Sequence, residues 1–210
     1  MKDLYIIGAG GFGREVVWLI ERINEVKPTW NIKGFIDDKK SLWGTFEEEY
    51  PVLGGCEYLA DKEDVYVVCA VGTAAVRRKV IAKLQETYVQ FATLIDPSVL
   101  ISKRVKVGEG TIICAGTIIT VDIEIGSHVI INLNCTIGHD AIIHDYVTIY
   151  PSVNVSGNVQ VGECSELGTG TRIVQGKSVA SSTIIGAGSV VARNIEESGT
   201  YVGCPVKRIK

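Results

Sequence analysis

The stretch ITVDIEIGSHVIINLNCTIGHDAII, residues 119–143, carries an aliphatic residue at every sixth position. The series runs without an insertion from Ile95 to Val191, and all seventeen positions hold isoleucine, leucine or valine. The next residue is often glycine, and the fifth residue of each hexad is mostly small or β-branched. We therefore expect one buried side chain and one tight corner, at that glycine, in every hexad.

A six-residue period fits neither an α-helical face, which recurs every 3.6 residues, nor a continuous strand, whose face recurs every two. The chain must therefore run straight for a few residues and then turn. Three straight sides close a triangular coil of about 18 residues, and coils stack about 4.8 Å apart through backbone hydrogen bonds. The spacing predicts a prism of about five to six coils with an aliphatic interior.

A buried strand, a glycine-rich loop and a helix are predicted at the start of the chain. Leu4 to Ile7 is apolar, GAGGFG follows at residues 8–13, and the apolar stripe of a helix begins at Val16. The G-x-G-x-x-G spacing lets backbone N–H groups approach a phosphate at a helix N-terminus. Acids at residues 37 and 38 follow a second strand, where they can meet ribose hydroxyls. This pattern predicts an α/β nucleotide site.

The first domain is short. A third strand is predicted over residues 65–71 and its helix over residues 75–86, so the unit closes at about residue 88. This is half the length of a complete dinucleotide fold, and the nucleotide of a sugar donor fits it better than NAD. We expect two domains, residues 1–88 and residues 89–210.

Composition excludes several classes of protein. The 210 residues carry a net charge of −3, which disfavours nucleic acid as a partner. No apolar run reaches the roughly 20 residues of a membrane helix, and the start is too short and acidic for a signal peptide, so we expect no membrane partner and a cytoplasmic location. The six cysteines form no Cys-x-x-Cys motif and are interpreted as core residues.

His139 is the candidate base among only three histidines. It occupies the third position of its hexad, where the side chain points outward, and Asp140 follows it. Residues 18 apart stack, which places Val121 and Gly157 on either side of His139 and leaves an open groove. A neutral imidazole can accept a proton from an attacking amine or hydroxyl. From the residues alone, a single histidine on a solvated face remains the alternative.

Taken together, these elements resemble the sugar acetyltransferases of the sialic acid O-acetyltransferase and bacillosamine N-acetyltransferase group. The resemblance rests on the glycine loop, the hexapeptide rod, and the phrases FIDD at 35–38, FATLIDPS at 91–98 and GCPVK at 203–207. It covers the whole chain. It implies an α/β Rossmann-like domain followed by an all-β left-handed parallel β-helix, assembled as a homotrimer with active sites between subunits.

The resemblance also implies the reaction and its residues. Acetyl-CoA would be the cosubstrate, His139 the general base, Asp140 its orienting partner, and Asn132 a further orienting group. CoA would contact the coils at Thr148, Gly157, Thr169 and Ala187. The acceptor, a sugar or nucleotide sugar, would contact Gly10, Gly11, Phe12, Asp37, Asp38 and Gly72.

Two departures from the bacillosamine enzymes weaken the case for their particular substrate. Phe12 and Thr148 stand where those enzymes carry histidine, and Phe12 is equally well a hydrophobic staple onto the helix. The acids at 47–49 are most simply a solvated loop. N-acetylation and O-acetylation are left open, as is the identity of the sugar.

Two other classes of function stay open as alternatives. The spacing of His139 and His144 resembles part of the zinc site of hexapeptide-repeat carbonic anhydrases, but Lys103 stands where the third histidine would lie. His144 is otherwise interpreted as a corner or subunit-contact residue. A non-catalytic trimer that binds a nucleotide sugar is the second alternative.

Overall fold

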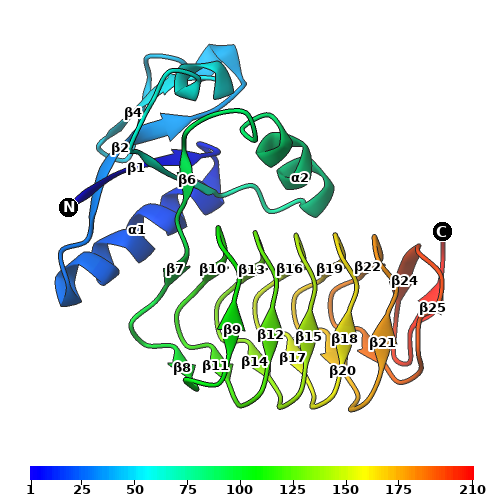
Figure 1. Cartoon of the computed structure of the whole chain (residues 1–210). Coiled ribbons are helices and arrows are strands. Elements are labelled where there is room, and N and C mark those ends of the chain that lie inside the picture. Colours follow the sequence, from blue (N-terminus) through cyan, green and yellow to red (C-terminus); the bar gives the residue numbers. More distant parts are fainter. The chain divides into compact units, whose positions relative to one another are not determined.

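A computed structural model describes the whole chain, residues 1–210, which forms two compact units (Figure 1). Residues 1–72 and 76–97 make the first unit, and residues 98–210 with 73–75 make the second. The first unit is an α/β domain and the second is a parallel β-helix, so the predicted fold class is confirmed. Neither helix is long and apolar enough to cross a membrane.

A mainly parallel sheet forms the centre of the first unit, with strand order β3-β4-β2-β1-β5-β6 and only β3 and β4 antiparallel. Because β1 pairs with both β2 and β5, the loops after these three strands meet at one edge of the sheet. Up to residue 97 the elements are β1 (Lys2–Ile7), α1 (Gly11–Val26), β2 (Trp30–Ile36), the 3-10 turn η1 (Lys40–Leu42), β3 (Phe46–Glu47), β4 (Tyr50–Gly54), the 3-10 turn η2 (Cys56–Leu59), β5 (Tyr66–Cys69), α2 (Ala74–Ala82), β6 (Gln90–Phe91) and β7 (Leu94–Ile95).

Short strands on three sides make the rod, and each pairs in parallel with the strand one coil later. The first side carries β10 (Ile112–Ile113), β13 (Ile130–Ile131), β16 (Thr148–Ile149), β19 (Glu166–Leu167), β22 (Ile184–Ile185), β24 (Thr200–Val202) and the antiparallel β25 (Lys207–Arg208). The second carries β8 (Leu100–Ile101), β11 (Ile118–Ile119), β14 (Thr136–Ile137), β17 (Asn154–Val155), β20 (Arg172–Ile173) and β23 (Val190–Val191). The third carries β9 (Lys106–Val107), β12 (Glu124–Ile125), β15 (Ile142–Ile143), β18 (Gln160–Val161) and β21 (Ser178–Val179).

The aliphatic series fills the interior of the rod. Ile112 pairs with Ile130 and Ile118 with Thr136, a separation of 18 residues that confirms three hexads to a coil. Every aliphatic residue of the series from Ile113 to Val191 is buried. This column of packed side chains supplies the hydrophobic stabilisation that two-residue strands lack on their own.

The fourth residue of each hexad turns the corner. From Gly110 to Gly188, all fourteen residues at this position have φ between 54° and 74°. This corrects the expectation that the glycine directly after the aliphatic residue makes the turn. That glycine permits close stacking instead, since a Cβ on Gly108 would lie 2.5 Å from the carbonyl carbon of Gly126 in the next coil.

Candidate active site

His139 and Asp140 lie at the corner after β14, and their side chains are joined. His139 Nδ1 is 2.7 Å from Asp140 Oδ2. Asp140 is the fourth residue of its hexad, with a φ of 58°, so the corner itself sets the direction of its side chain. A carboxylate only accepts hydrogen bonds, so the contact assigns the ring proton to Nδ1 and leaves a lone pair on Nε2. An imidazole in this tautomer can accept a proton at Nε2.

The pair is held by backbone bonds on both sides rather than by burial. The Asn158 N–H donates to the His139 carbonyl at 2.7 Å, and the Asp140 N–H donates to the Val121 carbonyl at 3.2 Å. The two side chains are 52% and 59% exposed, so the contact between them contributes little to stability. Its effect is to orient the imidazole.

Gly157 lies against the imidazole, as the 18-residue stacking predicts. A Cβ at position 157 would come 2.5 Å from His139 Nε2 and 2.6 Å from Cε1. Any side chain there would displace the ring. The glycine therefore leaves the space beside Nε2 free of a side chain.

The other predicted residues of the rod differ in their surroundings. Asn132 accepts a local hydrogen bond from the Leu133 N–H at 2.7 Å through its side-chain oxygen. Thr169 and Ala187 are exposed at corresponding corners one coil apart, whereas Thr148, in β16, is buried.

Of the remaining two histidines, His128 lies at a corner and His144 directly follows β15, which corrects its interpretation as a corner residue. His128 is buried and stacks on Tyr146, with ring centroids 5.2 Å apart. His144 is exposed beside a surface groove of about 450 Å³ that Gly108 and Gly126 also line. No group of three or more histidine, cysteine, aspartate or glutamate side chains has an arrangement that could hold a metal ion.

The glycine loop of the first unit is closely packed. A Cβ on Gly13 would overlap the Gly8 carbonyl oxygen, so the first turn of α1 sits directly on the end of β1. Gly10 caps α1 and has open space around its Cα, and no acidic residue stands in the first turn of the helix. The N–H groups there are suited to an anion.

Asp37 and Asp38 have different partners. Asp37 uses both carboxylate oxygens on backbone N–H groups, those of Ala9 at 3.0 Å and Lys39 at 2.9 Å. Asp38 Oδ2 receives the ammonium of Lys83 at 2.6 Å, and this hydrogen bond holds the pKa of Asp38 below its ordinary value. Asp38 Oδ1 accepts the Cys56 N–H at 3.2 Å.

Both acids line a pocket of about 180 Å³ at the edge of the sheet where the strands end, together with Ile7, Gly8, Ile36, Cys56, Val71, Val76 and Val80. Phe12 is half-buried on α1. The carbonyl of Gly72 accepts a hydrogen bond at 2.9 Å from the buried guanidinium of Arg77, which also binds the Val71 carbonyl. Arg77 therefore ties the loop after β5 to α2.

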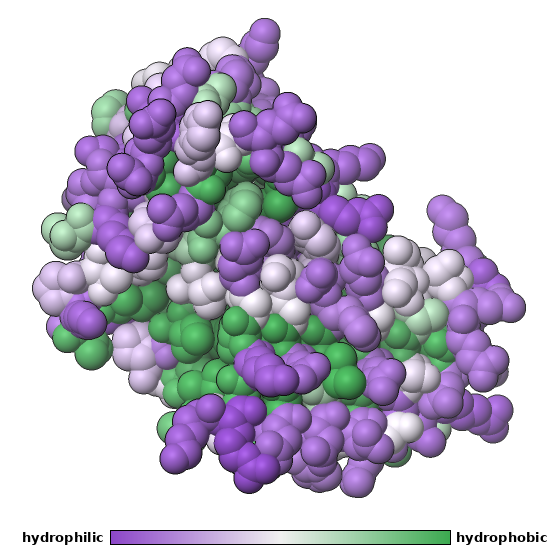
Figure 2. Space-filling view, in the orientation of Figure 1, coloured by the Kyte–Doolittle hydropathy of each residue, from purple (hydrophilic) through white to green (hydrophobic).

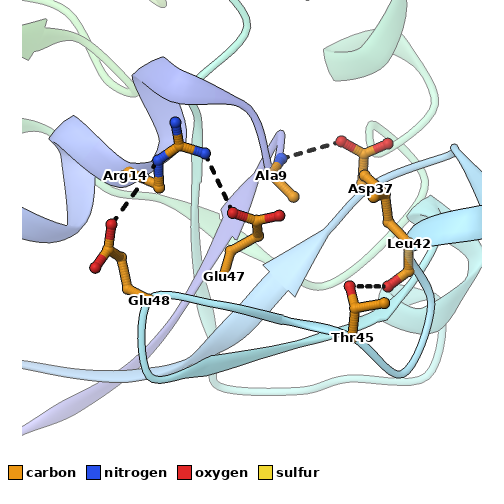
Figure 3. Close-up of polar contacts among 7 residues, drawn as sticks. All are labelled: Ala9, Arg14, Asp37, Leu42, Thr45, Glu47 and Glu48. Atoms are coloured by element: carbon orange, nitrogen blue, oxygen red, sulfur yellow. Dashed lines mark hydrogen bonds and ion pairs between the residues drawn. The ribbon is translucent and has the colours of Figure 1, made fainter.

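Glu47 ends β3, and Glu48 and Glu49 form the exposed two-residue turn of the β3–β4 hairpin, in keeping with the expected solvated loop. Figure 3 shows Arg14, on the first turn of α1, between two of them. Its guanidinium lies 3.2 Å from Glu47 and 3.8 Å from Glu48. In the same view Asp37 receives the Ala9 N–H, so both contacts hold the start of α1.

Known proteins share this sequence and fold. Residues 3–84 match the family described as the PglD N-terminal domain. The chain is 28% identical to GDP-perosamine N-acetyltransferase of Escherichia coli O157:H7, over 83% of this chain and 79% of that protein. It is 36% identical to UDP-N-acetylbacillosamine N-acetyltransferase of Bacillus subtilis, over 55% of this chain and 52% of that protein.

Solved structures match over the full length. WeeI from Acinetobacter baumannii is 30% identical with a TM-score of 0.90, and the match covers 100% of both chains. The chain belongs to the PglD-like acetyltransferase family. The acetyltransferase domain of PglB from Neisseria gonorrhoeae, solved with acetyl coenzyme A, is 28% identical with a TM-score of 0.89 over 99% of both chains.

Within the PglD-like fold, Lys83 and Cys56 are two residues beside Asp38 that the sequence did not indicate as part of the candidate nucleotide site. Lys83 reaches Asp38 across 45 positions, and Cys56 follows β4 in a segment without a motif. Their only possible signal was their position after the second helix and the fourth strand, because no fixed spacing links either of them to the glycine loop.

Proposed function

We propose that this chain transfers the acetyl group of acetyl-CoA to an amine or hydroxyl of a nucleotide-linked sugar, with His139 as general base. The observation that carries the proposal is the 2.7 Å contact between His139 Nδ1 and Asp140 Oδ2, which leaves Nε2 free to accept a proton beside Gly157. The acetyl coenzyme A complex of the Neisseria domain supports the donor. The names of the two relatives support a nucleotide sugar as acceptor.

The reaction follows from the chemistry of these groups. Nε2 takes the proton of the sugar amine or hydroxyl as its nitrogen or oxygen attacks the thioester carbonyl. The new C–N or C–O bond forms, the C–S bond breaks, and the departing thiolate recovers a proton from the imidazolium. Asp140 stabilises the charged ring between these steps.

We also propose that a homotrimer completes the site. The dyad is open to solvent in the single chain, and a second wall would exclude water from the thioester. Aliphatic residues are exposed on the rod near this corner, with Leu100 65%, Ile118 42% and Val121 39% exposed. Figure 2 shows apolar side chains gathered over the rod around β9, β12 and β15. Light scattering of the purified protein should give three times the 22.7 kDa chain mass.

The test of the base is kinetic. His139→Ala should lower kcat for acetyl transfer by roughly 10²- to 10⁴-fold while CoA still binds. His144→Ala is the matched control, because it removes an exposed imidazole elsewhere on the rod. Equal turnover in the His139 variant and the wild type would refute the assignment.

A further inference from the structure

The pocket at the ends of β1, β2 and β5 has apolar walls and one charged edge. Ile7 and Ile36 form one part of the wall and Val71, Val76 and Val80 another. Val76 and Val80 stand one helical turn apart on α2, so their side chains share a face. Val76 is 46% exposed although it is apolar. A flat aromatic ring would cover this surface, and the base of a nucleotide is such a ring.

Asp38 lines the pocket at its charged edge, and the Lys83 ammonium is bonded to the Asp38 carboxylate. Asp37 directs both oxygens to backbone N–H groups and so shapes the loop. Asp38 is bound more loosely, by one backbone N–H at 3.2 Å and by the Lys83 ammonium at 2.6 Å. The hydrogen bond raises the pKa of Lys83 and lowers that of Asp38, so both groups keep their charges at neutral pH. The edge therefore presents acceptors beside a donor.

We propose that Asp38 and Lys83 recognise the nucleotide base and select guanine over uracil. The inference rests on the proposed function, since it assumes that a nucleotide sugar occupies this pocket. Guanine presents two adjacent donors, N1–H and the N2 amino group, next to the acceptor O6. The carboxylate accepts both donors and the ammonium donates to O6, which is the charge-assisted pairing that both groups favour.

Uracil matches the same edge poorly. It carries a single N–H between two carbonyl oxygens, so one carboxylate oxygen would face a carbonyl oxygen instead of a donor. Discrimination of this kind is strong because a mismatched ligand leaves polar groups unpaired. Here it is moderated by water, since the Lys83 and Asp38 side chains are 54% and 50% exposed. We expect GDP to bind roughly tenfold more tightly than UDP.

Calorimetric titration of the full chain with GDP, UDP and ADP, without acetyl-CoA, measures this preference. Asp38→Asn replaces an acceptor by an amide donor and should bring the GDP to UDP affinity ratio close to one. Lys83→Met removes the donor to O6 at similar side-chain length and should also lower the ratio. Lys79→Met is the matched control: it removes an exposed lysine of α2 and leaves the Lys83–Asp38 bond in place, so the ratio should stay at the wild-type value.

The ratio distinguishes base recognition from a general loss of binding. UDP or ADP binding as tightly as GDP would overturn the proposal, as would a ratio that neither variant changes. Failure of all three nucleotides to bind would overturn it as well. If Asp38→Asn does not fold, judged by its thermal midpoint, Lys83→Met alone decides. Nucleotide binding needs neither acetyl-CoA nor His139, so the outcome is separate from the kinetic test of acetyl transfer.

Discussion

Gly157 sets the position of the His139 imidazole from one coil away. The ring lies against the Cα of the glycine, where a Cβ would come 2.5 Å from Nε2. Residues 18 apart are neighbours in the rod, so the groups that orient the candidate base come from its own corner and from the corner stacked on it. This relationship makes Gly157 a positioning residue that can be tested apart from the base.

Gly157→Ala should lower kcat by roughly 10- to 100-fold, because a displacement of about 1 Å is enough to misalign a catalytic group. The fold should persist, since Gly157 does not have a positive φ. Steady-state kinetics and a thermal melt would measure both effects. Ser156→Ala, at the same corner, is the control that adds no atom beside the ring. Wild-type kcat in Gly157→Ala would contradict the assigned position.

Asp140→Asn should lower kcat by roughly 10- to 100-fold, because a neutral amide no longer holds the ring proton on Nδ1 or stabilises the imidazolium. Nitrogen NMR of the imidazole should show the tautomer population shifting away from Nδ1–H. Asp122→Asn is the matched control, since Asp122 occupies the equivalent corner one coil earlier, with a φ of 57°, and pairs with Arg104. An unchanged tautomer and an unchanged kcat would together exclude the orienting role.

Ile131→Ala should destabilise the protein by about 2–5 kcal/mol, because it empties a fully buried site in the interior of the rod. Ile184→Ala removes the same atoms from a side chain that is 46% exposed, and its free energy of unfolding should change by less than about 1 kcal/mol. Urea unfolding of both variants gives the comparison. Equal losses would mean that the side chain of residue 131 does not point inward.

The six thiols should react in two classes. Cys204 is exposed and the other five cysteines are buried, so an aromatic disulfide reagent at pH 8 should label one thiol rapidly in the native protein and six in denaturant. More than one rapid thiol would contradict the packing of the core.

The same thiols make stability depend on pH above neutrality. Burial raises the pKa of Cys56 and Cys135 to about 11 and that of Cys69 to about 12, from an ordinary value of 9.0. The folded protein holds these protons more tightly than the unfolded chain, so stability is complete below about pH 9 and falls as pH rises through 11. Urea unfolding at pH 7.5, 9 and 10.5 measures the trend. Cys135→Ala should reduce the loss of stability between pH 9 and pH 10.5. A wild-type protein that is more stable at pH 10.5 than at pH 9 would refute the prediction.

Local and repeated features could be predicted from the chain alone. The six-residue series identified the three-sided rod, its buried side chains and the stacking of Gly157 on His139, since each contact recurs at a constant separation. The glycine loop identified the first strand and helix for the same reason, because its residues act within one turn. The pairing of His139 with Asp140 was predictable because it joins two residues that are adjacent in the sequence.

Contacts between distant segments needed the tertiary structure. Lys83 reaches Asp38, Glu47 reaches Arg14, and Arg22 binds the buried Asp96 across 74 positions. In the first unit, the number of positions between contacting residues depends on the lengths of the crossover connections. No sequence period therefore predicts these contacts. The corner residue of each hexad was also misassigned, because backbone φ depends on stacking against the next coil as well as on residue type. In a constant repeat, residues in contact are separated by a fixed number of positions, so the sequence shows which residues will meet. In an irregular α/β sheet that number varies, and the contacts are known only once the sheet has packed.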